Sequence, residues 1–229
     1  MMNKKIVFLT GAGISAESGV KTFRDYDGLW EGHSVEEVAT LDGWEKDKQK
    51  VLDFYNERRR QLGSVEPNLA HKLIGDLEKD YDVSVITQNV DDLHERGGST
   101  KVMHLHGELL KMCSSIDKEK TLPYNDDIKV GDKHSDGSQL RPYIVWFGED
   151  VTLIDDAVEE VKTADILVII GTSLEVYPAA GLMRYAKSNC DLYYIDPKPK
   201  MSSGVAQYFT VIKKVATEGV KEFIYILKK

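Results

Sequence analysis

The sequence predicts an α/β fold in which parallel strands are joined by crossover helices, with two excursions from the main sheet. Short β-branched runs recur along the chain, and longer amphipathic segments separate them. A chain of 229 residues, 41% of them hydrophobic, is long enough for one large domain or for one domain with a small insertion. Residues 23–62 and 107–142 interrupt the alternation, and these stretches are the predicted excursions.

The individual elements follow from this alternation. The predicted strands are residues 5–10, 83–87, 102–105, 143–147, 166–170, 192–195 and 209–212. The predicted helices are residues 48–62, 68–79, 153–162, 179–187 and 218–227. Pro67 and Pro178 lie at the start of two of these helices. Proline is tolerated there because the amides of the first turn have no partner within the helix. Residues 107–142 are polar and turn-rich, which leaves open a mobile surface loop or a small separate lobe.

Charge and hydropathy exclude several classes of partner. Thirty Lys and Arg residues against 38 Asp and Glu residues give a net charge of −8, which predicts no binding to nucleic acid or to an anionic membrane. The longest strongly apolar run, residues 166–170, is far shorter than the ~20 residues of a membrane span. The two cysteines, Cys113 and Cys190, form no disulfide framework and no four-thiolate metal site. We therefore expect a cytoplasmic protein.

A glycine-rich turn follows the first predicted strand. Residues 11–16 read Gly-Ala-Gly-Ile-Ser-Ala, which fits the G-x-G-x-x-G/A pattern in its required place. Backbone amides at such a turn can hold a pyrophosphate, whereas the alternative is a tight turn whose glycines adopt positive φ. A dehydrogenase also needs an acidic residue at the end of a second strand. Asp25, Asp27 and Glu31 have no strand before them, which disfavours hydride transfer.

Polar residues also follow the later strands. Residues 171–173 form a second glycine turn after the most apolar strand, and Asp196 ends the next one. Because ligands gather beyond the carboxyl ends of strands in an open α/β sheet, these turns can converge on one nucleotide. Asp196 is a candidate acceptor for a ribose hydroxyl, and its alternative role is a cap before Pro197.

Two further polar groups lie at the same predicted edge. Residues 87–94 begin at a strand end and include Gln88, Asn89 and Asp91, although the carboxylates in this stretch have helix capping as an alternative role. His106 precedes a glycine, and a neutral imidazole can take a hydroxyl proton near neutral pH. A lone histidine at a strand end is more often structural, but the neighbouring polar groups favour a base.

The chain resembles the sirtuin family of NAD-dependent protein-lysine deacylases, specifically the bacterial type related to the mitochondrial desuccinylase branch. The matching blocks occur in family order and span most of the chain. They are Gly11-Ala12-Gly13-Ile14-Ser15-Ala16-Glu17-Ser18-Gly19, Thr22-Phe23-Arg24, Thr87-Gln88-Asn89-Val90-Asp91, His106-Gly107, Phe147-Gly148-Glu149, and Gly171-Thr172-Ser173 through Pro178-Ala179.

The resemblance implies a Rossmann-like parallel sheet with a small second domain built from two insertions, and NAD in the cleft between them. The core would comprise approximately residues 1–22, 63–106 and 143–229, and the small domain approximately residues 23–62 and 107–142. The residues implied to bind NAD are Gly11, Ala12, Gly13, Ser15, Ala16, Phe23, Arg24, Gln88, Asn89, Val90, Asp91, Gly171, Thr172, Ser173, Asp196 and Ala216. Asn89 and Asp91 would surround the nicotinamide.

The resemblance also implies the chemistry and the substrate site. The acyl oxygen of an acylated lysine would attack the nicotinamide ribose, and His106 and Asn89 are the implied catalytic residues, His106 taking a ribose hydroxyl proton. The products would be free lysine, nicotinamide and O-acyl-ADP-ribose. Two segments would sandwich the substrate peptide as an added strand. Their implied contact residues are Val145, Phe147, Gly148, Glu149, Leu174, Glu175 and Val176.

Tyr55 and Arg58 predict the acyl preference. Their i, i+3 spacing places both on one helical face, and the segment resembles the one that lies over the acyl-lysine tunnel in the desuccinylase branch. Arg58 can grip a carboxylate, which predicts removal of succinyl and malonyl groups as well as acetyl. The alternative is a solvated basic face formed by Arg58, Arg59 and Arg60, with Tyr55 packed beneath it.

Two departures from the family pattern stand out. The family normally holds a structural zinc with two cysteine pairs, but residues 107–142 contain only Cys113, so we expect no zinc. A makeshift site is the alternative, formed by Cys113, Asp132, His134 and Asp136. Asp196 stands where the family more often carries Asn.

Competing functions are ADP-ribosyl transfer, plain NAD hydrolysis, and a non-catalytic sensor of NAD or ADP-ribose. The sequence assigns no oligomeric state.

Overall fold

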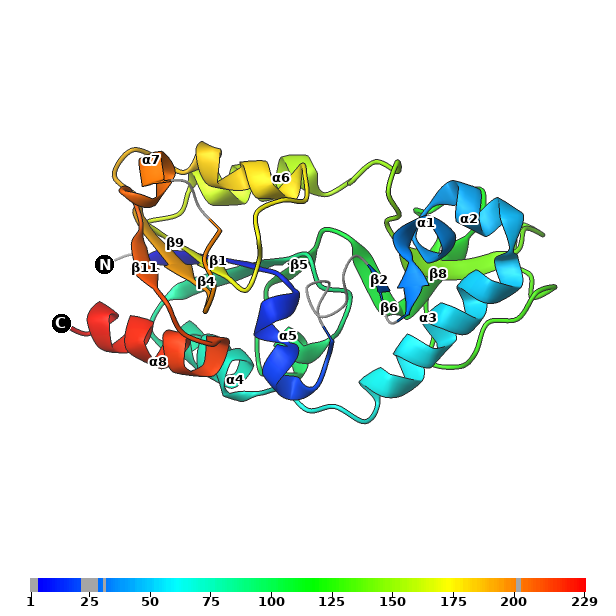
Figure 1. The fold of residues 1–229 in the computed structure, drawn as a ribbon, viewed down its shortest axis with the longest axis horizontal. Helices are drawn as coiled ribbons and strands as arrows, with labels where there is room; N and C mark the ends of the chain where they lie inside the picture. Colours follow the sequence, from blue (N-terminus) through cyan, green and yellow to red (C-terminus); the bar gives the residue numbers. More distant parts are fainter. Residues whose placement is uncertain (1–3, 22–28, 31, 201–202) are drawn as a thin grey trace.

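A six-stranded parallel sheet forms the larger part of the molecule, as predicted for an α/β fold (Figure 1). The computed structural model describes residues 4–21, 29–30, 32–200 and 203–229. The sheet has the order β11-β10-β9-β1-β4-β5. Its strands are β1 (Lys5–Thr10), β4 (Asp82–Thr87), β5 (Val102–His104), β9 (Ile166–Ile170), β10 (Asp191–Ile195) and β11 (Thr210–Ile212).

The strand order creates a crevice at the carboxyl end of β1. The chain runs outward from β1 to β4 and β5, and then returns to β9 on the opposite side of β1. Where the connections from two neighbouring strands run in opposite directions, a gap opens beyond the carboxyl ends of those strands. Open α/β sheets bind their ligands in this gap. The polar turns after β1, β4 and β9 therefore share one edge.

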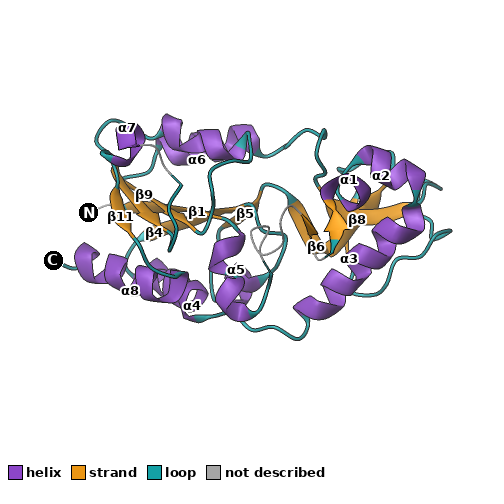
Figure 2. Cartoon of the chain, viewed as in Figure 1, coloured by secondary structure: helices purple, strands orange, loops and turns teal. Residues whose placement is uncertain are grey.

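Helices cover both faces of this sheet (Figure 2). Ile6 and Phe8 point into one apolar cluster with Phe223, whereas Val7 and Leu9 point into another. This alternation explains why β1 is apolar from Ile6 to Leu9, since a strand covered on both faces has no solvent side. Helices α4 and α8 cover one face, and α6 covers the other (Figure 1). The helices around the sheet are α4 (Leu69–Asp76), α5 (Leu93–Arg96), α6 (Ile154–Lys162), α7 (Ser203–Ala206) and α8 (Ala216–Leu227).

A second, antiparallel sheet lies at the other end of the molecule and packs against three helices (Figure 2). It has the order β7-β6-β8, and Trp44, Phe54 and Trp146 fill the core between it and the helices. The strands are β6 (Gly107–Ser114), β7 (Thr121–Pro123) and β8 (Leu140–Ile144), with a separate hairpin of β2 (Leu29–Trp30) and β3 (His33–Ser34). The helices are α1 (Val35–Val38), α2 (Leu41–Lys46) and α3 (Lys48–Leu62). Residues 107–142 thus supply most of a sheet rather than one long loop.

The predicted elements match the structure to within three residues at each end, except for two. The predicted strand at 143–147 is wrong, because residues 140–144 form β8, which pairs antiparallel with β6 in the small sheet. A strand that returns through a loop instead of a crossover helix pairs antiparallel with its predecessor. The predicted helix at 179–187 is a 3₁₀ helix, Ala179–Tyr185. Helix α3 has its predicted bounds, with the Asp47 side chain accepting a hydrogen bond from the amide of Lys50.

Three shorter 3₁₀ helices complete the described chain: Ala12–Ile14, Ala16–Ser18 and Leu77–Lys79. The first two follow β1 directly and carry the glycine-rich turn to the edge of the crevice. None of the helices in the described ranges has the length and apolarity that a membrane span requires.

Candidate active site

A cleft of about 990 Å³ separates the carboxyl ends of the parallel strands from the small sheet. This volume lies at the upper end of the range for pockets that hold small molecules and cofactors. Most of the predicted site residues line it. They are Gly11, Ala12, Gly13, Ala16, Tyr55, Arg58, Gln88, Asn89, Val90, Asp91, His106, Val145, Phe147, Gly148, Glu149, Gly171, Thr172, Ser173, Glu175, Val176 and Asp196.

The remaining predicted residues lie elsewhere. Ser15 is buried beneath the cleft floor, and Leu174 packs against the apolar cluster on the α6 side of the sheet. Ala216 is buried as well, and its neighbour Val215 lines the cleft in its place. Phe23 and Arg24 fall outside the described residues.

The two glycine turns pack backbone against backbone. The amide of Gly13 donates to the carbonyl oxygen of Gly171 at 2.8 Å, and a Cβ added to Gly13 would lie 2.6 Å from the Cα of Gly171. Gly171 has a φ of +61°, which favours glycine. The amides of Gly11, Ile14 and Ser15 also donate to backbone carbonyls. These glycines therefore serve close packing of the two turns, and four amides of the first turn are engaged within the protein.

His106 is held as a neutral base. Its Nδ1 lies 3.0 Å from the carbonyl oxygen of Gln88, which can only accept, so Nδ1 carries the proton and Nε2 keeps its lone pair. Burial lowers the pKa of His106 below its ordinary value, although the hydrogen bond to Gln88 opposes this shift. An imidazole that is neutral at pH 7, with one fixed tautomer, is suited to take a proton from a hydroxyl group.

Ser15 links Asn89 and Asp91, two polar residues that line the cleft together with His106. The Asn89 Nδ2 donates to the Ser15 hydroxyl at 3.1 Å, and that hydroxyl donates to the Asp91 Oδ2 at 3.0 Å. The amide of Leu93 donates to the other carboxylate oxygen at 3.2 Å. Burial raises the pKa of Asp91 to about 6, and these two hydrogen bonds oppose the rise. The bonds fix the orientation of Asn89 and Asp91 at the cleft.

A pair of buried histidines packs beneath Ser15. The rings of His71 and His94 meet edge to face at 4.9 Å, and the His94 Nε2 lies 3.0 Å from the Thr10 hydroxyl. Burial lowers the pKa of His71 to about 4 and also lowers that of His94, so both rings are neutral. His71 was not predictable as part of this region, because its position on a helix carries no motif. Its contacts mark it as part of the packing beneath Ser15.

Another part of the cleft lining is rich in donors. The Gln88 Nε2 donates to the Thr172 hydroxyl at 3.1 Å, and the Asp196 Oδ1 accepts from the Lys198 amide at 2.7 Å. Three lysines that the motifs did not reveal also line the cleft: Lys21, Lys198 and Lys200. The alternation of lysine and proline after Asp196 was the available signal for two of them. Cationic side chains beside hydroxyl and carboxylate groups suit a phosphorylated nucleoside.

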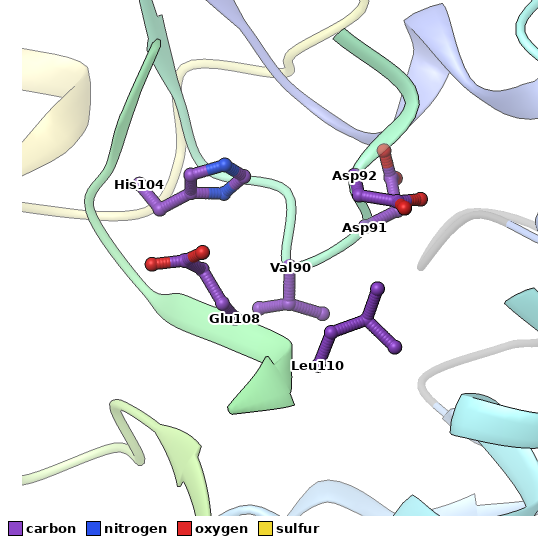
Figure 3. A pocket seen from close by; sticks show the side chains of 6 residues that line it. All are labelled: Val90, Asp91, Asp92, His104, Glu108 and Leu110. Atoms are coloured by element: carbon purple, nitrogen blue, oxygen red, sulfur yellow. The ribbon is translucent and has the colours of Figure 1, made fainter. Parts of the chain in front are cut away.

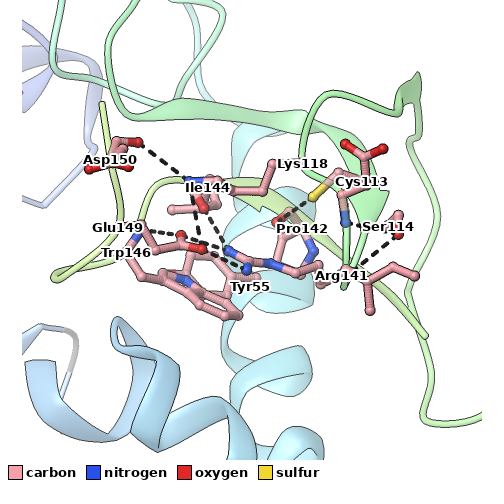
Figure 4. Close-up of polar contacts among 12 residues, drawn as sticks. Tyr55, Cys113, Ser114, Lys118, Arg141, Pro142, Ile144, Trp146, Glu149 and Asp150 are labelled. Carbon is pink, nitrogen blue, oxygen red and sulfur yellow. Dashed lines mark hydrogen bonds and ion pairs between the residues drawn. The ribbon is translucent and has the colours of Figure 1, made fainter. Parts of the chain in front are cut away.

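An aromatic and ionic cluster forms the wall near the small sheet (Figure 4). Arg141 donates to both carboxylate oxygens of Glu149 at 3.0 Å, and its guanidinium lies 3.5 Å from the centroid of the Trp146 ring. The Trp146 Nε1 donates to the hydroxyl of Tyr55 at 3.0 Å. Burial raises the pKa of Tyr55, so its hydroxyl stays neutral. The Glu149 carboxylate is thus engaged with Arg141, although the residue lines the cleft.

The alternative reading of the arginine run is wrong for two of its members. The Arg58 side chain is only 10% exposed and lies at the cleft, where it pairs with Glu57 at 2.9 Å. Arg59 is buried, and its Nε donates to the carbonyl of Leu109 at 2.8 Å. Arg60 alone of the three is exposed, and it pairs with Asp127. The three arginines therefore do not form one solvated face.

The four residues of the alternative zinc site do not gather around a common point. Within the described ranges, no group of three or more His, Cys, Asp or Glu side chains is arranged to hold a metal ion. The Cys113 thiol donates instead to the carbonyl of Pro142 at 3.8 Å, and burial raises its pKa to about 11. A thiol with a raised pKa is a poor metal ligand, because the thiolate is the form that binds.

Comparison with known proteins decides the family. The Sir2 family model matches residues 11–178, which is well over half of the chain. The chain belongs to the Sir2 family. A Helicobacter pylori protein named NAD-dependent protein deacylase is 60% identical over 197 residues, which cover 86% of this chain and 86% of that protein.

Solved Sir2 structures share the whole architecture. The structure of a Sir2 homologue in complex with NAD is 37% identical, covers 99% of this chain and 90% of its own, and superposes with a TM-score of 0.87. A Sir2 variant bound to a p53 peptide and NAD is 26% identical, with a TM-score of 0.79 over 99% of this chain and 94% of its own. Both Sir2 structures therefore superpose over the parallel sheet, the small sheet and the cleft between them.

Proposed function

We propose that this chain is an NAD-dependent protein-lysine deacylase that transfers acyl groups from lysine side chains to the ribose of NAD. The observation that carries the proposal is His106, a neutral imidazole of fixed tautomer in a cleft whose motifs belong to the Sir2 family. The acylated-lysine residue would belong to a protein or peptide, and nucleic acid has no role in this reaction.

The residues of the cleft fit a dinucleotide. We assign the turn at residues 11–16, Gln88, Thr172, Ser173 and Asp196 to its adenosine and phosphate portions, and Asn89 and Asp91 to the nicotinamide end. The chemistry of the lining supports this assignment, because hydroxyl, amide and lysine groups can bind phosphates and the carboxylates of Asp91 and Asp196 can accept from amide and ribose hydroxyl groups. NAD supplies an activated ribose as acyl acceptor and releases nicotinamide. His106 takes the hydroxyl proton at Nε2.

The acyl group would occupy the part of the cleft lined by Tyr55 and Arg58. Arg58 lies there with a cationic head, and Trp146 holds the Tyr55 hydroxyl in place. We propose that this wall accepts succinyl and malonyl groups through Arg58 and acetyl groups through the apolar surface. The peptide would lie between residues 145–149 and 174–177, where Phe147 and Val176 are exposed.

Three further parts of the proposal concern the chain as a whole. We propose a core of approximately residues 1–22, 63–106 and 143–229, and a small domain of approximately residues 23–62 and 107–142. We propose that the small domain folds without zinc, since its Cys113 is engaged with a backbone carbonyl. We also propose a cytoplasmic location, which the two free cysteines support.

Product analysis tests the proposed activity. The protein is incubated with NAD and matched acetyl-, succinyl- and malonyl-lysine peptides, and mass spectrometry identifies every product. We expect free lysine peptide, nicotinamide and O-acyl-ADP-ribose in equal amounts. ADP-ribosylated protein, or ADP-ribose formed without loss of acyl peptide, would replace the proposal with transfer or NAD hydrolysis. Bound NAD that remains intact would indicate a sensor.

A further inference from the structure

His104 lies between two acceptors at the end of β5. Its Nδ1 is 2.9 Å from the backbone oxygen of Asn89, and its Nε2 is 2.8 Å from the Glu95 Oε1. A carbonyl oxygen and a carboxylate oxygen can only accept, so both ring nitrogens carry protons and the ring is an imidazolium. The His104 side chain is 5% exposed, whereas that of Glu95 is 41% exposed. A buried cation is thus tied to a carboxylate at the surface.

We propose that His104 and Glu95 form a positioning pair that fixes the Asn89 peptide at the nicotinamide end of the cleft. The proposal rests on the proposed function, because it takes Asn89 as part of the NAD site. Asn89 is held at three points: its amide donates to the Thr87 hydroxyl, its side chain donates to Ser15, and its carbonyl accepts from His104. The third bond is charge-assisted, and it is the one of these three in which a titrating group contacts Asn89 directly.

The surroundings of His104 favour its charged form. Burial alone would lower the pKa of His104, but the hydrogen bond and the charge of Glu95 outweigh burial and raise it. Figure 3 shows His104 and Glu108 on one side of a cavity of about 20 Å³, with Asp91 and Asp92 opposite. Among the described residues, His94 also interacts electrostatically with His104, and it is neutral. The charge of His104 in turn lowers the pKa of Asp91.

The sign of the pH effect follows from these contacts. Because the folded pKa of His104 is raised, the charge-assisted bond to Asn89 is present below that pKa. Above it the neutral ring keeps one proton, which stays at Nε2 because the Glu95 carboxylate is the stronger acceptor, so the bond from Nδ1 to Asn89 is lost as the pH rises. A Glu95→Gln variant removes the charge that stabilises the imidazolium, so the loss should occur at lower pH. A His104→Leu variant removes the donor to Asn89 at every pH.

The binding of two ligands, NAD and ADP-ribose, distinguishes a positioning defect from general damage to the site. NAD carries the nicotinamide and ADP-ribose lacks it. A defect at Asn89 should therefore weaken the binding of NAD and leave the binding of ADP-ribose unchanged. Calorimetry at pH 7 should show NAD weakened by about 5- to 20-fold in His104→Leu and by about 2- to 5-fold in Glu95→Gln, with ADP-ribose unchanged. Glu66→Gln is the matched control, because Glu66 pairs with Arg96 and does not contact His104. NMR titration should show the His104 pKa above 6.5 in the wild type and lowered in Glu95→Gln.

The outcomes distinguish this inference from the proposed function. Equal weakening of NAD and ADP-ribose, no weakening of either, or a wild-type His104 pKa at or below 6.5 would overturn the positioning pair, even in an active deacylase. A selective loss of NAD affinity supports the pair whether or not the wild type deacylates peptides. If the wild-type protein does not bind NAD at all, both the pair and the proposed function are wrong.

Discussion

At the scale of single residues, a backbone carbonyl sets the chemistry of His106. The oxygen of Gln88 accepts from Nδ1, so the basic nitrogen is Nε2, and burial keeps the ring neutral. No neighbouring carboxylate performs this orienting role among the described contacts of His106. The base is therefore weak but is already deprotonated at neutral pH, which suits proton removal late in a reaction.

We expect His106→Ala to abolish deacylation while NAD still binds. Loss of a general base lowers turnover by roughly 100- to 10,000-fold, whereas the contacts assigned to the phosphates and adenosine remain. Calorimetry with NAD and mass spectrometry of products measure the two properties separately. Because the pKa of His106 is lowered, wild-type kcat/KM should fall on the acid side with a midpoint below 6.5. Near-normal turnover by the variant would remove His106 from the mechanism.

Arg58→Met should weaken the use of succinyl peptides far more than that of acetyl peptides. A lost charge-assisted hydrogen bond of about 1.5–3 kcal/mol corresponds to a decrease of roughly 10- to 150-fold in kcat/KM. Arg60→Met is the matched control, since Arg60 lies on the same helix but pairs with Asp127 at the surface. An equal effect of Arg58→Met on both peptides would make Arg58 a structural residue.

At the scale of elements, Arg141 joins the small sheet to the segment proposed to bind peptide. It lies on β8, bonds to the Glu149 carboxylate and to the carbonyl of Ile144, and stacks on Trp146. Burial alone would raise the pKa of Glu149, but the hydrogen bonds and the charge of Arg141 outweigh burial and lower it. The pair therefore stabilises the fold at neutral pH, and its contribution is lost as the pH falls through the folded pKa of Glu149.

We expect Arg141→Met to lower the free energy of unfolding by about 3 kcal/mol, because it removes the two-point partner of a buried carboxylate, which keeps only Lys118 at 3.6 Å and the amide of Trp146. Arg60→Met, which breaks an exposed ion pair, should cost at most about 1 kcal/mol. Urea denaturation of both variants measures the difference. A similar small loss in the two proteins would show that water replaces Arg141 at the Glu149 carboxylate.

The elements also show what the sequence can predict. The strand at 166–170 was predictable because a run of five apolar residues, most of them β-branched, is too short for a helix and favours a strand buried on both faces. Helix α3 was predictable from its periodicity. The strand at 143–147 was misplaced, because the sheet that a strand joins depends on distant partners, here residues 107–114. The polar turns at the strand ends indicated the cleft, but no local pattern indicated that Trp146 would line it with Arg141 packed behind.

At the scale of the whole molecule, the small sheet is closed by hydrogen bonds at its far end. The Ser114 hydroxyl accepts from the amides of Ile116 and Asp117 and bonds to the hydroxyl of Ser138 at 2.8 Å. Lys120 also pairs with Asp136 at 3.6 Å. These contacts connect the end of β6 to the beginning of β8, so the sheet has a source of local stability that requires no metal ion.

We therefore expect chelation to leave the melting temperature unchanged. Elemental analysis of the purified protein should find far less than one zinc per chain, and a strong chelator should alter neither unfolding nor deacylation. A structural zinc site would supply folding energy directly, so its removal would unfold the small sheet. Stoichiometric zinc that is lost together with the fold would contradict the expectation.

The contact between Gly13 and Gly171 limits how this sequence can change over time. A steric clash caused by one substitution is usually relieved when a neighbour becomes smaller, and such paired changes let related proteins diverge. Here each neighbour is already the smallest residue, so no second substitution can rescue the first. In a library that samples both positions together, we expect every functional clone to retain both glycines. The two turns should therefore be inherited as one unit, while the surfaces around them remain free to vary.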